Sequence, residues 1–370
     1  MKAVILVGGE GTRLRPLTIH TPKPMIPLVN IPLLEYTLHH LKEYGIREII
    51  LSTCYFPQVF ESYFGDGSRL GLEITYVAEE RPLGTCGAVK NVEKYLDGTF
   101  IVLNGDVLSS LNLEDMISFH RTRGAVGTIY LTPVEDPTAY GLVLVDEKGR
   151  VESFLEKPSW DQVTTSLING GTYILELEVL DLVPPGQNYS FERGLFPALL
   201  ERDRPLFGYP SLAYWMEIGT PEKYLQAHWD ILDGKFEPGF LGIKGGCSPH
   251  LGEGTFVDPS AHILGTVVIE NGCHIGADVT IAGPAVLGSG CSVGERTTVE
   301  GSVILDSCTI GRACRIKDSI LSKGVSLQGE VHVLDNSVIG DNCLIEKDNQ
   351  LKRAVRVFPG TYLKEGSIKF

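Results

Sequence analysis

Two cations and a glycine loop lie close together near the start of the chain. The strand-like run Lys2–Val7 leads into Gly8-Gly9-Glu10-Gly11-Thr12-Arg13-Leu14, and Pro22-Lys23-Pro24-Met25 follows shortly after. Glycines allow backbone N–H groups to approach phosphate oxygens closely. An arginine and a lysine can neutralise the charge that builds on a departing pyrophosphate. The segment therefore predicts a site for a triphosphate.

Two familiar glycine motifs do not match this loop. From Gly9 the chain reads G-x-G-x-x-L, so the third glycine of the dinucleotide fingerprint is missing, and no segment reads G-x-x-x-x-G-K-[ST]. An alternative is that the glycines after this first strand only form a tight turn. The neighbouring charged residues favour the binding of an anion.

A carboxylate that could hold a metal follows the apolar run Thr99–Leu103, in the turn Asn104-Gly105-Asp106. At the end of a buried strand Asp106 can meet solvent and a hard cation without deep burial. Magnesium is the natural candidate, because triphosphates carry it and it needs only one or two protein carboxylates. The alternative is a turn aspartate that caps a helix.

Glu217 is a second candidate carboxylate, placed where a short strand gives way to a helix that starts near Thr220. It could complete the metal site, or it could only cap the positive end of that helix. Lys157, in Glu156-Lys157-Pro158, could hold an acceptor phosphate, and a surface turn lysine is the alternative. For both residues the spacing leaves the two interpretations open.

Two further segments could line a substrate pocket. Pro82-Leu83-Gly84-Thr85 precedes a helix, so its backbone and Thr85 could border a base or ribose near the positive end of that helix. Asn169-Gly170-Gly171 could offer an amide side chain and uncovered backbone to sugar hydroxyls. It could also be only the entry of a strand.

Alternating strands and helices position these residues up to about residue 233, which predicts an α/β fold with a mainly parallel sheet covered by helices. Ligands then lie at the carboxyl ends of the strands, so the glycine loop and Asp106 should share one crevice. One helix is expected after Asn30 and ends at Gly45, and three more are expected over 85–95, 191–201 and 221–232. The expected strands are 2–7, 48–53, 73–78, 99–103, 125–132, 141–146, 150–155 and 171–175.

A six-residue repeat of aliphatic residues begins after a Gly- and Pro-rich segment. A repeat sustained this long predicts a parallel β-helix, in which each short strand buries its aliphatic residue by stacking on the next coil. Small residues recur four positions later, and they include Cys273, Cys291, Cys308, Cys314 and Cys343, which we interpret as packing residues. The repeat, with two one-residue slips, runs through Val257, Ile263, Ile269, Ile275, Ile281, Leu287, Val293, Val299, Ile304, Ile310, Ile316, Leu321, Leu327, Val333, Ile339, Ile345, Leu351, Val357 and Leu363.

Composition limits the class of protein. A chain of 370 residues with 43% apolar residues predicts two domains, and we place them at 1–233 and 255–370 with a linker at 234–254. A net charge of −14 without a basic cluster argues against nucleic acid as a partner. No stretch approaches the ~20 apolar residues of a membrane span, so we expect a cytoplasmic protein. Eight cysteines without C-x-x-C pairs predict neither a disulfide framework nor a zinc site.

Taken in order, the segments Gly8–Leu14 with Lys23, Pro82–Thr85, Asn104–Asp106, Glu156–Pro158, Asn169–Gly171 and Trp215–Pro221 strongly resemble the sugar-1-phosphate nucleotidylyltransferases. With the hexapeptide tail the layout is most like mannose-1-phosphate guanylyltransferases. The resemblance implies a Rossmann-like nucleotidyltransferase domain followed by a left-handed parallel β-helix. It also implies that a sugar 1-phosphate oxygen attacks the α-phosphorus of a nucleoside triphosphate and releases pyrophosphate, with GTP and mannose 1-phosphate giving GDP-mannose as the favoured case.

The resemblance also assigns roles to single residues. Arg13 and Lys23 bind and activate the triphosphate, and Asp106 and Glu217 hold Mg²⁺. The family usually has aspartate where this chain has Glu217, a departure of one methylene that matters because magnesium demands a strict geometry. The nucleotide-binding positions are Leu6, Gly8, Gly9, Gly11, Thr12, Gly84 and Thr85, and the sugar-phosphate positions are Gly141, Glu156, Lys157, Asn169 and Gly171.

Three alternatives remain at this point. The chain could be another NDP-hexose synthase, of the UDP- or dTDP-glucose type, because base and sugar depend on few residues. It could be a non-catalytic, sugar-nucleotide-sensing regulatory subunit, although Arg13, Lys23, Asp106 and Lys157 are all present. It could also be bifunctional, with His262, His274 or His332 serving acyl transfer in the β-helix. We further expect a homo-oligomer, formed through the β-helix.

Overall fold

The computed structural model describes residues 1–54, 57–243 and 249–369, so Cys247 lies outside the described residues. Contacts divide the chain into two compact units. The first unit is Met1–Gly9 with Tyr36–Trp215, and the second is Glu10–Glu35 with Met216–Phe370. The segment that carries Arg13 and Lys23 therefore belongs to the same unit as the hexapeptide repeats.

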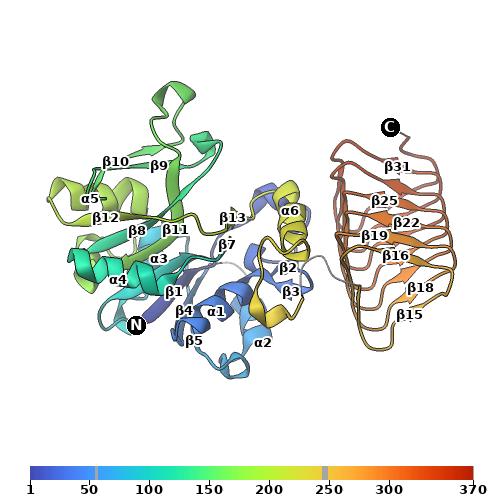
Figure 1. The fold of residues 1–370 in the computed structure, drawn as a ribbon, viewed down its shortest axis with the longest axis horizontal. Coiled ribbons are helices and arrows are strands. Elements are labelled where there is room, and N and C mark those ends of the chain that lie inside the picture. Colours follow the sequence, from blue (N-terminus) through green and yellow to red (C-terminus); the bar gives the residue numbers. More distant parts are fainter. Residues whose placement is uncertain (55–56, 244–248, 370) are drawn as a thin grey trace. The chain divides into compact units, whose positions relative to one another are not determined.

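A nine-stranded sheet forms the centre of the first unit, in the order β10-β9-β11-β6-β1-β4-β5, with β8 paired to β11 and β12 to β8 (Figure 1). Every strand predicted for this region forms. The one expected at 171–175 is longer and starts at Leu167. The bounds are β1 Lys2–Leu6, β4 Glu48–Thr53, β5 Glu73–Ala78, β6 Phe100–Asn104, β8 Gly127–Pro133, β9 Gly141–Val145, β10 Val151–Glu156, β11 Leu167–Leu175 and β12 Leu206–Pro210.

The sheet is mixed rather than mainly parallel. Strands β5, β4, β1 and β6 run parallel, as expected, whereas β11 is antiparallel to β6, β8 and β9. Strands β9 and β10 are antiparallel because they are joined by a tight turn, in which Asp146 N donates to Arg150 O at 2.8 Å. Such a short connection cannot join parallel neighbours. The parallel part carries the glycine loop and the Asp106 turn.

The helices of this unit are α1 (Leu33–Glu43), whose first residues belong to the second unit, α2 (Pro57–Phe64), α3 (Gly84–Asn91), α4 (Leu113–Arg123) and α5 (Phe196–Glu201). Two of them differ from the prediction. The helix expected over 85–95 ends at Asn91 and continues as a 3₁₀ turn, and the one expected over 191–201 begins with a π turn at Phe191. Helices α2 and α4 were not predicted, although Asn112 caps the start of α4 and Gly124 ends it. None of the described helices is long and apolar enough to cross a membrane.

Three parallel sheets in the second unit confirm the β-helix (Figure 1). The first sheet contains β14 His250–Leu251, β17 Val267–Ile269, β20 Ala285–Leu287, β23 Val303–Ile304, β26 Ile320–Leu321, β29 Val338–Ile339 and β32 Arg356–Val357. The second contains β15 Phe256–Val257, β18 His274–Ile275, β21 Ser292–Val293, β24 Thr309–Ile310, β27 Ser326–Leu327, β30 Leu344–Ile345 and β33 Tyr362–Leu363. The third contains β16 His262–Leu264, β19 Thr280–Ala282, β22 Thr298–Glu300, β25 Arg315–Lys317, β28 His332–Val333 and β31 Gln350–Leu351.

The predicted aliphatic residues form the core of this β-helix, and only those at its ends, Val257, Ile263 and Leu363, stay partly exposed. The five predicted packing cysteines are buried, and their thiols donate to backbone carbonyls of neighbouring coils, as Cys308 does to Ser322 O at 3.0 Å. The packing interpretation of the cysteines is thus confirmed.

The rest of the second unit includes residues 10–35, strand β13 (Trp215–Glu217) apart from its first residue, and helix α6 (Pro221–Leu232). The short antiparallel pair β2 (Pro27–Leu28) and β3 (Ile31–Pro32) contacts α6. His228 on α6 is 1% exposed, and its Nδ1 accepts a hydrogen bond from Val29 N at 3.2 Å. Burial lowers the pKa of His228 to about 3, so the folded protein holds this imidazole neutral.

We predict that His228 makes the protein less stable as the pH falls from about 6.5 toward 3. In that interval His228 binds a proton in the unfolded chain but not in the folded one. The free energy of unfolding therefore falls by ~1.4 kcal/mol for each pH unit. Urea unfolding between pH 5 and pH 7 should therefore show a smaller pH slope for His228→Asn, whose amide oxygen can replace Nδ1. The control variant His262→Asn, at an exposed position, should keep the wild-type slope. Equal slopes for all three proteins would refute this assignment.

Candidate functional site

The turn that carries Asp106 lies beside the start of the glycine loop. Strands β1 and β6 are adjacent and parallel, with Leu6 opposite Asn104, and Gly105 N donates to Leu6 O at 3.0 Å. A Cβ at Gly105 would lie 2.8 Å from the Val7 side chain, so only glycine allows this approach. Half-buried Asp106 thus emerges at the carboxyl edge where β1 ends, as predicted.

Glu79 lies at the same edge of the sheet and was not predicted as a site residue. It follows β5, and its carboxylate accepts hydrogen bonds from Ser52 Oγ at 3.2 Å and from Leu83 N at 2.9 Å. A Cβ at Gly8 would lie 3.4 Å from Glu79 Oε1. Burial raises the pKa of this carboxyl above its ordinary value. Its position directly after a parallel strand was the available signal in the sequence.

Several polar groups at the start of α3 are already hydrogen-bonded within the protein, which was not predicted. Cys86 N and Gly87 N both donate to Tyr189 O, at 2.9 and 3.0 Å. The Thr85 hydroxyl accepts from Phe191 N at 3.2 Å. These groups fix the loop before α5, so two N–H groups of this helix end are already paired. Thr85 therefore shapes this region by holding a neighbouring loop.

A second group of predicted residues gathers around β9, β10 and β11. Gly141 lies opposite Glu156 in the β9–β10 ladder, and a Cβ on Gly141 would lie 3.0 Å from Glu156 Oε2. Gly171 has φ +74°, and its Cβ position lies 2.6 Å from Asn104 Nδ2, so any other residue would be strained and would clash. Lys157 is exposed, and its backbone N–H donates to Tyr140 O at 3.0 Å.

Asn169 uses both ends of its amide inside this group. Its Oδ1 accepts from Gly171 N at 3.0 Å, and its Nδ2 donates to Tyr173 Oη at 2.9 Å and to Glu192 Oε1 at 3.0 Å. Glu192 also accepts from Ser190 Oγ at 2.7 Å. Glu192 was not predicted as a site residue, because it lies far from Asn169 along the chain, in a π turn. It fixes the orientation of the Asn169 amide.

The second unit brings together Arg13, Lys23 and Glu217. Arg13 lies in the 3₁₀ turn Thr12–Leu14, directly after Gly11. Gly11 has a φ of +62°, and a Cβ placed on it would lie 3.1 Å from Lys23 Cβ, so this position requires glycine. Arg13 Nη2 lies 2.5 Å from Glu217 Oε1, and Lys23 Nζ lies 3.8 Å from the same oxygen. Two cations therefore converge on one negatively charged oxygen.

This geometry changes the interpretation of Glu217. Both sequence-based alternatives, a metal ligand and a helix cap, overlooked its contacts with Arg13 and Lys23. The cap of α6 is Thr220, whose hydroxyl accepts from Lys223 N. Among the described residues no group of three or more His, Cys, Asp or Glu side chains could hold a metal ion.

The structure does not bring together the three histidines considered for acyl transfer. His262 and His332 belong to β16 and β28 of one sheet, with three strands between them, and His274 belongs to β18 of another. His274 stacks on Phe256 with 5.0 Å between ring centroids. No pair of these histidines forms a common site.

Comparison with known proteins identifies the fold and the class of enzyme. Residues 2–234 match the family model described as nucleotidyl transferase. The chain belongs to the nucleotidyl transferase family. Residues 250–351 match the model described as the EIF2B subunit epsilon LbH domain. Together the two matches cover both the α/β region and the hexapeptide repeats.

Similar proteins carry names of sugar-nucleotide enzymes. The chain is 45% identical over 277 residues to a mannose-1-phosphate guanylyltransferase of Mycobacterium tuberculosis, covering 74% of this chain and 76% of that protein. It is 36% identical over 352 residues to a probable mannose-1-phosphate guanylyltransferase 3 of Oryza sativa, covering 92% and 86%. It is 37% identical over 246 residues to a UTP–glucose-1-phosphate uridylyltransferase of Synechocystis, covering 63% of each chain.

Solved structures share the fold of the α/β region. HddC from Yersinia pseudotuberculosis is 32% identical, with a TM-score of 0.54, and the match covers 61% of this chain and 97% of that one. A putative glucose-1-phosphate thymidylyltransferase from Bacillus anthracis matches with a TM-score of 0.57 at 23% identity, covering 61% and 93%. The protein is therefore a nucleotidyltransferase with a Rossmann-like domain.

We predict that Gly219→Ala will disturb the contacts of Arg13 and Lys23 with Glu217. A Cβ there would lie 2.8 Å from Glu217 Oε1 and 3.1 Å from Arg13 Nη2, so both side chains must move. A roughly 10- to 100-fold loss of kcat/KM for the triphosphate is expected, corresponding to ~1.4–2.7 kcal/mol, with an unchanged melting temperature. Gly239→Ala is the control, since no described atom outside its neighbours lies within 4 Å of that Cβ. Equal activity of both variants would contradict the prediction.

Proposed function

We propose that the enzyme transfers a guanylyl group from GTP to mannose 1-phosphate, forming GDP-mannose and releasing pyrophosphate. The observation that carries this proposal is the convergence of Arg13 and Lys23 on one anionic oxygen, in a nucleotidyl transferase whose relatives are named mannose-1-phosphate guanylyltransferases. A regulatory subunit would not need these cations, so catalysis is favoured over sensing.

The triphosphate is bound by the cations that Glu217 holds in place. Lys23 is 6% exposed, whereas the Arg13 side chain is 64% exposed, so a substrate can reach its guanidinium. The positive charge of the two side chains attracts phosphate oxygens. Because that charge faces the departing pyrophosphate, it stabilises the transition state more than the ground state.

The sugar 1-phosphate supplies the nucleophile. One of its phosphate oxygens attacks the α-phosphorus in line, the bond to the β-phosphate oxygen breaks, and no covalent enzyme intermediate forms. The nucleophile is already anionic near neutral pH, so no strong general base is required. We assign Lys157 to its phosphate and Gly141, Glu156, Asn169 and Gly171 to the sugar. The fixed Asn169 amide then presents a defined face to hydroxyl groups.

The residues present fit a magnesium ion that arrives with the triphosphate. Such an ion keeps waters and phosphate oxygens as ligands and needs only one or two carboxylates, so half-buried Asp106 would be enough to hold it on the protein side. The metal would neutralise charge on the triphosphate during transfer.

We expect Asp106→Asn to lower kcat by at least about 10³-fold without changing the melting temperature, because it removes the charge that holds the metal. Pyrophosphate release is measured with GTP, UTP, dTTP and ATP against mannose 1-phosphate and glucose 1-phosphate, with Mg²⁺ and with EDTA. Wild-type turnover should be greatest with GTP and mannose 1-phosphate and need the metal. Exposed Asp181→Asn is the control. Full activity of Asp106→Asn would reject the metal role, and no turnover with any pair would reject the function.

Glu79 is the residue that we propose reads the base. Guanine presents two adjacent donors, N1–H and the N2 amino group, and a carboxylate only accepts hydrogen bonds. The Glu79 carboxylate has about four acceptor sites, and Ser52 and Leu83 use two of them. Uracil and thymine offer one N–H between two carbonyl oxygens, which a carboxylate would repel. The geometry therefore favours guanine.

Glu79→Gln should reverse part of this preference. The amide offers one acceptor and one donor, which pairs with the N3–H and O4 of uracil or thymine but not with both donors of guanine. We expect kcat/KM for GTP to fall by about 10- to 100-fold, and the ratio of GTP to UTP or dTTP to fall further. Exposed Glu80→Gln is the control for the lost charge. An unchanged ratio in Glu79→Gln would rule out this role.

A further inference from the structure

One face of the β-helix is apolar on its outer side. In the sheet from β14 to β32, Ile304, Ile339 and their equivalents point inward, so the preceding residues point outward. Outward residues of the second sheet, such as His274 and Thr309, are exposed as expected. In the first sheet, five successive outward residues are at most 6% exposed: Val268, Val286, Val303, Ile320 and Val338. Something must therefore cover this row.

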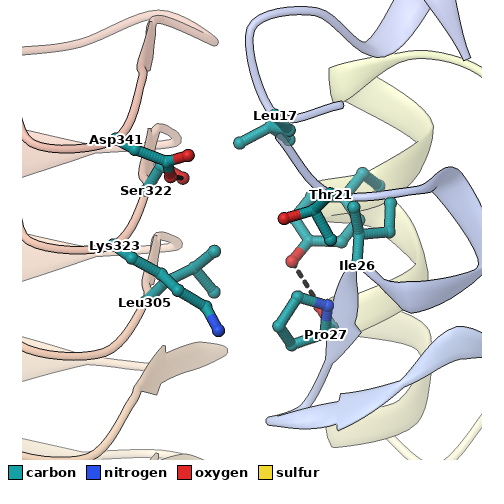
Figure 2. A pocket seen from close by; sticks show the side chains of 9 residues that line it. Leu17, Thr21, Ile26, Pro27, Leu305, Ser322, Lys323 and Asp341 are labelled. Atoms are coloured by element: carbon teal, nitrogen blue, oxygen red, sulfur yellow. Dashed lines mark hydrogen bonds between the residues drawn. The ribbon is translucent and has the colours of Figure 1, made fainter. Parts of the chain in front are cut away.

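Helix α6 and residues 10–35 make contacts along the row. Trp229 Nε1 donates to Gly301 O at 3.1 Å, and Asn30 Nδ2 donates to Leu287 O at 3.3 Å. His20 Nδ1 lies 3.2 Å from Asp341 Oδ2. Figure 2 shows the remaining gap, a cavity of about 10 Å³ with Leu17, Thr21, Ile26 and Pro27 on one side and Leu305, Ser322, Lys323 and Asp341 on the other. That volume holds about one water molecule.

The row ends in a charged residue. Val338 pairs with Arg356 on the next strand, so Arg356 takes the outward position that valine or isoleucine occupies on the five preceding coils. Its Nη1 donates to Arg13 O at 2.9 Å and to Arg15 O at 3.2 Å. A single guanidinium thus binds two nearby backbone carbonyls, that of Arg13 within the turn and that of Arg15 directly after it.

We propose that Arg356 is a positioning residue for the transfer reaction, which acts through Arg13. The inference rests on the proposed role of Arg13 at the triphosphate. Gly8, Gly9 and Gly11 leave the loop before Arg13 with much backbone freedom. The Arg13 side chain is held by Glu217 and its carbonyl by Arg356, so both ends of the residue are fixed before substrate binds.

The test compares Arg356→Ala with Arg353→Ala in the full-length protein. Both remove one positive charge from the same coil, but the Arg353 side chain makes no hydrogen bond or ion pair within the described residues. We expect Arg356→Ala to lower kcat for pyrophosphate release by about 10- to 50-fold, with KM for mannose 1-phosphate and the melting temperature unchanged. Arg356→Lys, which can still donate, should recover part of the rate. Arg353→Ala should behave as wild type.

A double-mutant cycle with Arg13→Ala separates positioning from a general structural role. If Arg356 acts through Arg13, adding Arg356→Ala to Arg13→Ala will lower the residual rate less than twofold. An equal loss in both backgrounds, or wild-type kcat in Arg356→Ala, would overturn the proposal. A wild-type protein that releases no pyrophosphate would instead reject the proposed function, so the two failures are distinguishable.

Discussion

The contact of Arg13 and Lys23 with one oxygen of Glu217 is the constraint on which the proposed triphosphate site depends. Two cations so close together repel each other, and Lys23 is almost fully buried. Without a carboxylate between them, this charge would be costly to hold in the folded protein. Glu217 therefore stabilises the cations in the absence of substrate, and phosphate oxygens can take over part of that task.

Glycine supports this constraint where the backbone must pass closely. Gly11 lets the loop pass beside Lys23, and Gly219 leaves room for the carboxylate and guanidinium that meet there. In the first unit Gly105 plays the same part, because it brings the Asp106 turn against β1. These glycines allow close contacts with neighbouring segments: Gly219 with charged side chains, and Gly105 with the backbone and side chains of β1 and the residue that follows it.

Local patterns predicted a large part of this structure. The strands that end at Leu6 and Asn104 have strong apolar runs, and the rule that ligands lie at the carboxyl ends of parallel strands placed Asp106 correctly beside the glycine loop. The inward residues of the β-helix follow a strict period of six, so their burial was predictable as well. Both signals come from repetition over short distances in the sequence.

The remaining features depend on contacts between distant segments. Glu192 meets Asn169 only because a π turn packs against β11, and Glu217 meets Arg13 across many residues of chain. The antiparallel pairing of β11 with β6 and β8 joins strands that are far apart in the sequence, so the strand pattern alone did not reveal it. The homo-oligomer and the domain boundaries remain predictions. The apolar outward residues of the first β-helix sheet, such as Val268 and Val338, were visible in the sequence. We did not recognise them, because the six-residue period of the inward residues is stronger.

Because the outward row ends at Arg356, the number of preceding coils sets the position of the guanidinium that binds the loop of Arg13. Neighbouring coils are spaced by about 4.8 Å, so the insertion or deletion of one complete coil before residue 356 would move the guanidinium by that distance. The inner core would tolerate such a change, since every coil buries similar residues. The number of coils before Arg356 thus determines whether its guanidinium can reach the loop of Arg13.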